Sequence, residues 1–362
     1  MDSYSITNEH GFIPQDERFE NGGTMRETDK KMYYIVSPHS FAYNPARINI
    51  GSIGYQNTDK NVIVSSLYEV FKTSDDVDDR LLWYWFKSSY FQKLIEQFQE
   101  GGVRLYFYYD KLCMGTLSLP SFEEQHKIGK YLDTYDNLIT LHQRKLDKMK
   151  ELKKAFLNLI FSQKLRFYGF TDSWELRKLE EVAPLRGGYA FQSNQYANEG
   201  IPIVRISNIL SDGSVGGEFV FHNELKDDEI FMLENGDIVL AMSGATTGKV
   251  SILSSEKSCK YYQNQRVGLF SKTATCNYSF VATIVRSEKF LEQLRDVLVA
   301  GAQPNVSAKD IDAFDFSVPK DVEEQSQIGN FFRTLDRLIT LYQKKIDSSK
   351  EMKKILLKNM LI

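Results

Sequence analysis

The residues best suited to specific chemistry in this chain are arginines, amides, tyrosines and hydroxyls that recur in short polar stretches. Guanidinium and amide groups pair with guanine and adenine edges, while hydroxyls and backbone amides suit phosphate. In the first third of the chain we therefore predict DNA contacts at Asn44, Arg47, Asn49 and Arg104. The predicted contacts of the second half are Arg186, Tyr189, Arg205, Asn208, Ser243, Thr246, Thr247, Lys249, Asn264, Gln265 and Arg266. Taken singly, each such residue is more often a turn residue, a helix cap or a solvated surface group.

Two motifs with enzymatic counterparts fail on their spacing. The stretch Gly244-Ala-Thr-Thr-Gly-Lys249 resembles a phosphate-binding loop, but three residues instead of four separate its glycines. Val250 then stands where such a loop has serine or threonine, so we exclude nucleotide hydrolysis. Asn44-Pro45 lacks the second proline and the aromatic residue of the amino-methyltransferase motif. No glycine-rich cofactor loop follows a strand-like segment, which argues against a methyltransferase.

The side chains that usually bind metals are not grouped. The histidines are scattered at His10, His39, His126, His142 and His222. None belongs to an HExxH motif or has a cysteine at metal-ligand spacing. The cysteines Cys113, Cys259 and Cys276 are odd in number, which suits a reducing cytoplasm rather than a disulfide framework. No set of nucleophile, base and acid can be assembled, so we predict a chain without a catalytic site of its own.

The bulk composition is that of ordinary soluble protein, with 42% apolar and 26% charged residues. A length of 362 residues exceeds what one hydrophobic core usually serves, so we expect two or more domains. No apolar run approaches the roughly 18 residues of a membrane span, and the N-terminus has no signal-peptide pattern. The net charge is −3, so DNA binding would need basic residues concentrated on one face, or a partner that contributes to the field.

One long stretch of the chain occurs twice, and it must position the polar segments. Residues 123–157 and 323–357 align without a gap at an offset of 200 positions, so that Asp136 matches Asp336 and Lys145 matches Lys345. A repeat of this length sets the architecture of a chain. We therefore expect one structural unit that is used twice.

Both copies carry a heptad pattern typical of a long helix that packs along another helix. The predicted seam of the first copy consists of Leu132, Tyr135, Ile139, His142, Leu146, Met149 and Phe156. That of the second copy consists of Phe332, Leu335, Ile339, Tyr342, Ile346 and Leu356. About 40 residues at 1.5 Å each give helices roughly 60 Å long, and we expect the two copies to pair with each other as an antiparallel coiled coil. Lys153 and Lys353 interrupt both seams at the same place, where we expect the helices to diverge.

The segments between the helices mix strand-like and helical patterns, which predicts an α/β (α+β) fold. Strands are predicted at 33–37, 48–53, 62–71, 104–109, 201–209, 237–242, 249–253 and 266–270. Helices are predicted at 80–100 and 278–299, each ended by glycine shortly afterwards. The predicted domains are residues 1–118, a helix at 119–163, residues 164–318 and a second helix at 319–362. Two globular segments would thus alternate with two paired helices in a pseudo-two-fold internal repeat.

At the repeated helices the chain resembles the specificity (S) subunit of type I restriction-modification enzymes. The first copy carries this resemblance in Leu119-Pro120, Glu123-Glu-Gln125, Ile128-Gly129, Leu138–Lys145 and Lys150–Lys154. The second copy repeats it in Val318-Pro319, Glu323-Glu-Gln325, Ile328-Gly329 and Leu338–Leu341. The connector Phe167–Lys178 is also similar to the segment that leads into that family's target-recognition domain. The likeness spans essentially the whole chain and is specific, because two diverged segments alternate with two near-identical helices.

The resemblance implies two target-recognition domains, each of which reads one half of a bipartite site in double-stranded DNA. It further implies that the paired helices form a spacer between the half-sites and dock two methyltransferase (M) subunits, with restriction (R) subunits in the full complex. S-adenosylmethionine, ATP and Mg2+ would be bound by those partner subunits, so that this chain binds no cofactor. Together with the cysteine usage, the resemblance implies a cytoplasmic protein without membrane contact.

One part of the family pattern is missing before the first globular segment. The sequence Gly169-Phe-Thr-Asp-Ser-Trp174 has no counterpart there, and only 119 positions separate Met1 from Pro120, against 145 between Trp174 and Pro319. The alternative to a reader of two half-sites is therefore a truncated or silent variant that acts only as a docking scaffold. A free-standing nuclease or methyltransferase is a third hypothesis, but the missing metal and cofactor motifs argue against it.

Overall fold

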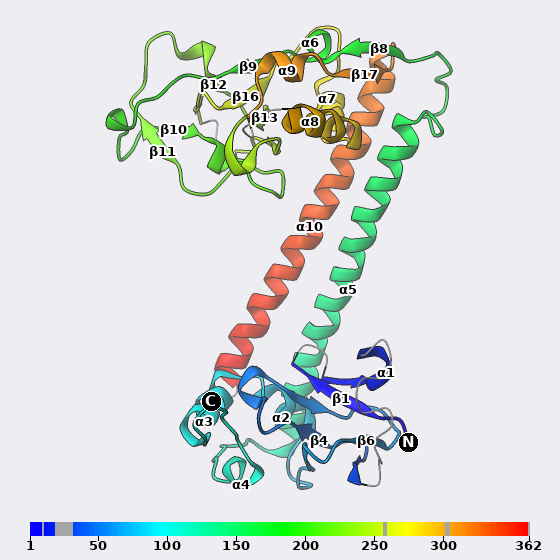
Figure 1. Ribbon diagram of the computed structural model, residues 1–362, viewed down its shortest axis with the longest axis vertical. Coiled ribbons are helices and arrows are strands. Elements are labelled where there is room, and N and C mark those ends of the chain that lie inside the picture. Colours follow the sequence, from blue (N-terminus) through cyan, green and yellow to red (C-terminus); the bar gives the residue numbers. More distant parts are fainter. Residues whose placement is uncertain (9–10, 19–31, 256–258, 301–304, 361–362) are drawn as a thin grey trace. The chain divides into compact units, whose positions relative to one another are not determined.

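Two long helices each contribute to both compact units of the chain (Figure 1). The computed structural model describes residues 1–8, 11–18, 32–255, 259–300 and 305–360. The first unit comprises residues 1–145 and 342–362, and the second comprises residues 146–341. Helix α5 (Phe122–Phe161) has 40 residues and α10 (Val322–Met360) has 39, close to the length that the repeat predicts. In the described part of the chain, no helix has the length and hydropathy needed to cross a lipid bilayer.

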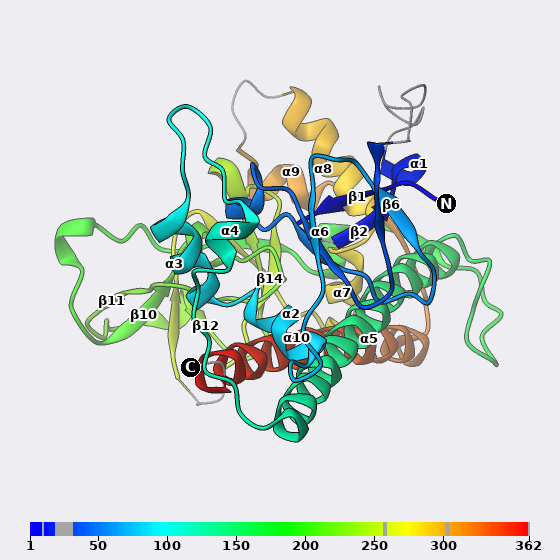
Figure 2. The ribbon, with the colours of Figure 1, turned by 90° about the horizontal axis from the view of Figure 1, so that it is seen from below.

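The strands of the first unit are short and pair antiparallel. β1 (Tyr4–Thr7) pairs with β2 (Gly11–Pro14), and β3 (Tyr34–Val36) pairs with β6 (Val62–Val64). A further sheet has the order β5 (Ile53–Tyr55), β4 (Phe41–Tyr43) and β7 (Glu69–Phe71). A bridge between Ser3 and Ile63 places β1 beside β6 (Figure 2).

The main core of the first unit joins the β5–β4–β7 sheet to the consecutive helices α2 (Asp79–Trp85) and α3 (Ser89–Phe98). One helix over 80–100 was predicted, but the chain forms two. Ser88 starts the second helix, because its hydroxyl accepts a hydrogen bond from the Phe91 N–H. Two additional helical turns are α1 (Gln15–Arg18) and α4 (Tyr109–Leu112).

The strand predictions of the first unit are wrong in part. Residues 48–53 divide into a 3₁₀ helix, η2 (Ile48–Ile50), and the start of β5, because Gly51 adopts a left-handed φ of 86° that turns the chain. The run 62–71 is broken by a turn between β6 and β7, and residues 104–109 form no named strand. Aromatic and β-branched residues face the core in these segments, and propensity cannot distinguish such packing from strand pairing.

The described residues of the second unit form two four-stranded sheets and a two-stranded sheet. The first has the order β11 (Val220–His222), β10 (Ile201–Val204), β15 (Tyr261–Gln263) and β12 (Met232–Leu233), with β10 and β15 parallel. The second has the order β14 (Val250–Ile252), β13 (Ile238–Ala241), β16 (Val267–Phe270) and β9 (Leu185–Gly187). The two-stranded sheet pairs β17 (Asp315–Val318) with β8 (Glu175–Lys178).

The helices of the second unit pack against the β14–β13–β16–β9 sheet through the largest hydrophobic core. They are α6 (Leu179–Val182), α7 (Tyr278–Ile284), α8 (Glu288–Ala300) and α9 (Ala308–Asp312). The predicted helix over 278–299 is again two helices, because the Ser287 hydroxyl accepts a hydrogen bond from the Phe290 N–H at 3.3 Å. The globular part of each unit therefore contains two consecutive helices that are separated by a capping serine.

A buried glutamine joins the start of each long helix to the globular part of its unit. Gln125 accepts a hydrogen bond from the Asp78 N–H at 2.9 Å and donates to the proline carbonyl before α5 at 3.0 Å. Gln325 accepts one from the Asn277 N–H at 2.7 Å and donates to the proline carbonyl before α10 at 2.8 Å. Asp78 and Asn277 are the N-caps of α2 and α7. The same contact therefore attaches α5 to α2 and α10 to α7.

One turn further along, a glycine lets each long helix approach the short helix closely. A Cβ on Gly129 would lie 2.9 Å from the Cβ of Arg80. A Cβ on Gly329 would lie 2.6 Å from the carbonyl carbon of Ser279 and 2.7 Å from the nitrogen of Phe280. Carbon atoms cannot pack this tightly, so both positions require glycine unless the helices separate. Close packing of α5 on α2 and of α10 on α7 thus explains why both copies share the sequence Glu-Glu-Gln-x-x-Ile-Gly.

The two long helices pair antiparallel in each unit, as predicted. In the first unit the rings of His142 on α5 and Tyr342 on α10 lie 6.0 Å apart between centroids. In the second unit Phe156 and Phe331 lie 5.2 Å apart. The fully buried residues of the predicted seam are Leu132, Leu146, Phe332 and Ile346, and the remaining ones are half-buried.

The prediction that the helices diverge at Lys153 and Lys353 is wrong. In the first unit the Lys353 ammonium forms an ion pair with Asp136 on α5. In the second unit the Lys153 ammonium forms one with Asp336 on α10. A lysine within a heptad seam keeps the helices in contact when the facing helix supplies a carboxylate at the same level.

The connector before β8 is anchored on the start of α10. The Trp174 indole N–H donates to the Glu324 carboxylate at 3.3 Å, and the Arg166 guanidinium pairs with the same group at 2.7 Å. Glu324 is buried, whereas its repeat counterpart Glu124 is exposed. Residues 116–119 precede α5 as β17 precedes α10, but they form no strand. The β17–β8 sheet therefore has no counterpart in the described part of the first unit.

Replacing Gly329 by alanine is expected to lower the free energy of unfolding by about 1–3 kcal/mol, because the added Cβ would push α10 away from α7. Urea unfolding of the full chain, followed by circular dichroism, measures this change. Gly102→Ala is the matched control, since a Cβ on Gly102 meets no atom within 4 Å. Equal unfolding curves for both variants would show that close approach is not the reason for the glycine.

Candidate nucleic-acid interface

A turn that carries exposed polar side chains connects the two four-stranded sheets of the second unit. Residues 264–266 lead from β15 in one sheet to β16 in the other. The Asn264 N–H donates to the Val204 carbonyl at 3.1 Å, and the Gln265 N–H donates to the Tyr189 carbonyl at 2.9 Å. These main-chain bonds hold the turn beside the segments that follow β9 and β10.

The loop between β13 and β14 reaches the same place. The Met242 N–H donates to the Arg266 carbonyl at 3.0 Å, and the Thr246 hydroxyl donates to the Ile206 carbonyl at 3.3 Å. The loop therefore contacts both the turn and the segment after β10. We call the predicted DNA contacts that are gathered in this way the junction surface. They are Tyr189, Arg205, Ser243, Thr246, Thr247, Lys249, Asn264, Gln265 and Arg266.

The tip of the junction surface combines an aromatic ring with amide and guanidinium groups. Gln265 and Arg266 are exposed, and Tyr189 is 46% exposed. The Tyr189 ring packs against Phe191 and Phe231, with 4.9 Å between ring centroids in each case. Because these neighbours support the ring from within the unit, its outer side is presented in a fixed orientation.

The charged members of the junction surface are all basic, namely Arg205, Lys249 and Arg266. The Nε atom of Arg205 is buried and has no hydrogen-bond partner in the described part of the chain, so an acceptor that reached it would be stabilising. The Lys249 ammonium donates to the Ser211 hydroxyl at 2.8 Å. Hydrogen bonds from the Ser214 hydroxyl and N–H lower the pKa of the neighbouring Asp212 carboxyl, so that Asp212 stays ionised.

Within the described ranges, no three His, Cys, Asp or Glu side chains gather as a metal site would require.

The loop 243–249 does not present its backbone amides as a phosphate-binding loop would. The N–H groups of residues 247–249 all donate to carbonyls of the loop or of β13, and the Thr247 hydroxyl donates to the Gly244 carbonyl at 2.7 Å. Gly248, at a left-handed φ of 87°, closes the turn. The amides of residues 247–249 are therefore bonded within the unit, so the prediction that the backbone amides of the loop suit phosphate does not hold for these three.

Asn208, a predicted DNA contact, is structural instead. It is 1% exposed and lies in the 3₁₀ helix η4 (Ile206–Asn208). Its Oδ1 accepts a hydrogen bond from the Arg205 N–H at 3.0 Å. Its Nδ2 donates to the carbonyls of Gly216 and Glu218, both at 3.0 Å. With its amide fully occupied, Asn208 positions Arg205 and does not contact DNA.

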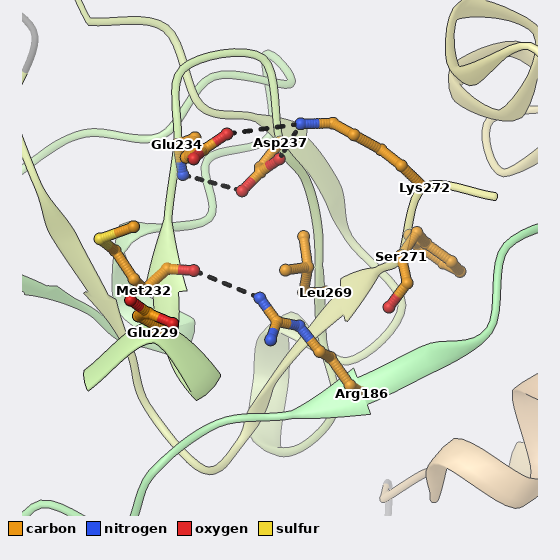
Figure 3. Close-up of a pocket in the computed structure, with 9 residues that line it drawn as sticks. Arg186, Glu229, Met232, Glu234, Asp237, Leu269, Ser271 and Lys272 are labelled. Carbon is orange, nitrogen blue, oxygen red and sulfur yellow. Dashed lines mark hydrogen bonds and ion pairs between the residues drawn. The ribbon is translucent and has the colours of Figure 1, made fainter. Parts of the chain in front are cut away.

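Arg186 also serves the fold rather than the junction surface. Its guanidinium donates to the carbonyls of Ile230 and Met232, and thereby joins β9 to β12 (Figure 3). Lys272 lines the same pocket and pairs with Asp237 at 3.1 Å (Figure 3). The basic groups of this pocket thus have partners within the unit.

In the first unit, the predicted contacts lie mainly on the loop between β4 and β5. Arg47 and Asn49 are exposed there. Asn44 supports the loop itself, because its Oδ1 accepts a hydrogen bond from the Ala46 N–H at 2.9 Å. Arg104 is exposed in the segment between α3 and α4.

Two tyrosines that sequence reasoning missed lie beside this loop. The rings of Tyr106 and Tyr108 stack with 5.6 Å between centroids and 2° between planes. The Phe107 N–H donates to the Pro45 carbonyl at 3.0 Å and so fixes both tyrosines next to the loop. The alternation of two tyrosines around a buried phenylalanine was the available signal, but the segment was interpreted as a strand.

The loops of the two units correspond. Residues 44–52 join β4 to β5 as residues 242–249 join β13 to β14. Left-handed glycines close both loops, Gly51 with φ of 86° and Gly248 with φ of 87°. Different side chains are therefore carried on one loop framework.

The turns before β7 and β16 correspond in the same way. In the turn 65–68 and in the turn 264–267, the last N–H donates to the first carbonyl, at 3.1 and 2.9 Å. Leu67, which is 68% exposed, occupies the place that Arg266 has in the second unit. Leu67 was also missed, because a lone leucine in a predicted strand indicates packing.

The sequence matches the family model described as "Type I restriction modification DNA specificity domain" over residues 21–151 and again over residues 171–349. The type I restriction enzyme MjaVIII specificity subunit of Methanocaldococcus jannaschii is 25% identical over 316 residues, which cover 82% of this chain and 72% of that relative. The type I restriction enzyme EcoAI specificity subunit of Escherichia coli is 23% identical over 266 residues, which cover 67% of this chain but only 45% of that relative.

The fold is shared with a solved structure. The crystal structure of a type I restriction-modification system S subunit from M. genitalium superposes with a TM-score of 0.64. The superposition covers 90% of this chain and 84% of that chain at 16% sequence identity.

Asn208→Ala is expected to lower the free energy of unfolding by about 1–3 kcal/mol, because three buried main-chain groups would lose their partner. Gln265→Ala, its matched control from the exposed turn, should change the free energy of unfolding by less than about 0.5 kcal/mol. Urea unfolding of the two variants in parallel measures the difference. If Asn208→Ala left the free energy of unfolding unchanged, Asn208 would again be a candidate for DNA contact.

Proposed function

This chain belongs to the type I restriction-modification DNA specificity family, and we propose that each of its two units reads one half of a bipartite DNA site. It acts as the sequence-recognition subunit of a type I restriction-modification enzyme. The family as a whole recognises DNA and leaves the chemistry to other subunits. On this proposal the chain performs no reaction of its own.

The observation that best supports this function is the gathering of nine predicted contacts on the junction surface. Exposed amide, guanidinium and phenol groups come from separate loops and face outward together. Gln265 suits the paired hydrogen bonds of an adenine edge, and Arg266 suits those of a guanine edge. Arg205 and Lys249 suit phosphate and would hold the unit in register on the duplex.

The corresponding surface of the first unit has a different character. Arg47 and Asn49 are its exposed polar groups, and Leu67 with the Tyr106–Tyr108 pair adds apolar and aromatic surface. Apolar side chains discriminate the thymine methyl group in the major groove. The two units are therefore expected to read unlike half-sites.

The proposed partners follow from the charge of the chain and from its helices. A net charge of −3 leaves little general attraction for DNA, so two M subunits would supply much of the positive field. These subunits, and R subunits where present, would dock along the paired helices. S-adenosylmethionine, ATP and Mg2+ would be bound by those partner subunits, and the complex would work in the cytoplasm.

A second candidate is the silent scaffold, which docks partners without reading a complete site. The observation that favours it is the exposed start of α5, where residues 116–119 form no strand and Glu124 is not covered. If the first unit does not read DNA, only the half-site of the second unit would be recognised. Specific affinity for a split site would then be lost.

Exchange of the globular segments tests which candidate holds. Replacing residues 1–118 or 169–318 with the equivalent segment of another family member should change one half of the methylated motif and leave the other half intact. Methylome sequencing of cells that express the chain with its M subunits measures both halves. An unsplit motif, or a motif indifferent to one exchange, would favour the silent scaffold.

Arg266→Ala is expected to weaken binding of the cognate site by about 1–3 kcal/mol and to relax specificity at one base pair of one half-site. Arg177→Ala is the matched control in the same unit, because Arg177 lies on β8, outside the two four-stranded sheets whose loops carry the junction surface, and pairs with Glu181 at 3.2 Å. Titration of duplexes with the reconstituted complex, at several salt concentrations, measures both effects. Equal losses for the two variants would remove Arg266 from base recognition.

A further inference from the structure

Each long helix has one lysine in its otherwise apolar seam, and each lysine meets a carboxylate of the other helix. The pairs are Lys353 with Asp136 in the first unit and Lys153 with Asp336 in the second. Both residues of one pair lie 200 positions from their counterparts in the other pair. We call these two ion pairs the register pairs.

Each carboxylate of the register pairs has a second donor on the globular part of its unit. The Tyr84 hydroxyl of α2, which lies 2.8 Å from both Asp136 and Asp133, can donate to Asp136, and the Arg286 guanidinium, just after α7, pairs with Asp336 at 3.1 Å. Burial lowers the pKa of Arg286, and Asp336 opposes that shift. Each carboxylate therefore links both long helices to the globular part of its unit.

The register pairs are half-buried. The side chains of Lys353 and Lys153 are 16% and 22% exposed, and those of Asp136 and Asp336 are 41% and 32% exposed. A pair in this setting adds little net stability, but an unpaired lysine in the same place would be costly. Such ion pairs select one alignment of the two helices and add little to its stability.

The seven-residue period of the seam does not by itself define one register, and outside the seam Ile160 of α5 and Leu357 of α10 also pack against the hydrophobic cores. Apolar residues recur every seven positions in both helices, so a shift by one heptad would again place apolar groups opposite each other. After such a shift Lys353 would face position 129 or 143, which are glycine and glutamine, instead of Asp136. Lys153 would face the equivalent positions 329 and 343, which are again glycine and glutamine.

We propose that the register pairs fix the register of the paired helices and thereby determine the gap between half-sites that the enzyme accepts. Asp136, Lys153, Asp336 and Lys353 are thus positioning residues for DNA recognition, although none contacts DNA. A shift of one heptad moves a helix by about 10 Å, or about three base pairs of duplex. The gap depends on the proposed function, whereas the register does not.

The first experiment reads the register without DNA. In the full chain, Cys113 and Cys259 are replaced by serine, and Ile139→Cys is combined either with Ser349→Cys or with Tyr342→Cys. The first combination reports the observed register, and the second reports a shift of one heptad. With the register pairs intact, only the first should form a disulfide.

The test variant is Lys153→Leu with Lys353→Leu, which removes the lysine charge from both seams and keeps the helices paired. The shifted disulfide should then appear at a yield comparable to that of the observed register. Lys127→Leu is the control, because Lys127 is exposed and pairs with Glu123 along the same helix. A second variant, Lys353→Asp with Asp136→Lys, reverses one pair and should restore the single register that Lys353→Asp alone loses.

The second experiment measures gap selectivity with the chain assembled with its M subunits. Methylation rates are compared on duplexes whose gap is native or up to four base pairs shorter or longer. The doubly substituted Lys→Leu variant should lose selectivity for the native gap by on the order of fivefold, while the charge-reversed pair regains it. Lys127→Leu should match the unsubstituted chain.

The outcomes separate the two proposals. A shifted disulfide together with lost gap selectivity supports the register pairs in full. An unchanged disulfide pattern, or a loss of rate on all gaps alike, overturns the proposal, because the lysines would then only support folding. If the unsubstituted complex methylates no split site, the proposed function fails, and the disulfide pattern alone decides whether the pairs set the register.

Discussion

The close contact between the start of each long helix and helix α2 or α7 in the globular part of its unit is the constraint on which the other features depend. Gly129 and Gly329 permit this approach, and Gln125 and Gln325 occupy the main-chain groups that the approach buries. A side chain at either glycine would separate the helices and leave the glutamine without its partners. Since the same contact occurs in both units, a few residues determine how each recognition part is attached to the paired helices.

The paired helices divide two tasks between two kinds of side chain. The apolar seam supplies the area that is removed from water, but its seven-residue period does not distinguish neighbouring registers. The half-buried lysines and aspartates add little to stability, yet they are compatible with one register. Each aspartate is also held by Tyr84 or Arg286, so pairing of the helices and docking of the recognition part are coupled at one carboxylate.

Different constraints on the long helices and on the globular parts explain why the helices are near-identical while the segments between them have diverged. Each long helix is constrained by the facing helix along its seam and by the globular part of its unit at its start. The loops that carry Arg47, Leu67, Gln265 and Arg266 are constrained mainly by backbone hydrogen bonds and left-handed glycines. Side chains on such loops can change without disturbing the framework, which is the property that a subunit with exchangeable specificity needs.

The sequence alone determined the repeat, the length and pairing of the long helices, the two diverged segments between them, and the family, because heptad periodicity and a fixed offset are local patterns that survive in linear order. It also identified most of the polar residues of the junction surface. Only the tertiary structure decided that Asn208 and Arg186 serve the fold, that Ser88 and Ser287 divide predicted helices, and that Lys153 and Lys353 have partners. These decisions rest on contacts such as the one from Asn264 to Val204, between residues 60 positions apart. Because an asparagine or arginine has the same chemistry as a cap, as a strand tie and as a base reader, its role depends on which distant groups the fold brings within hydrogen-bond distance.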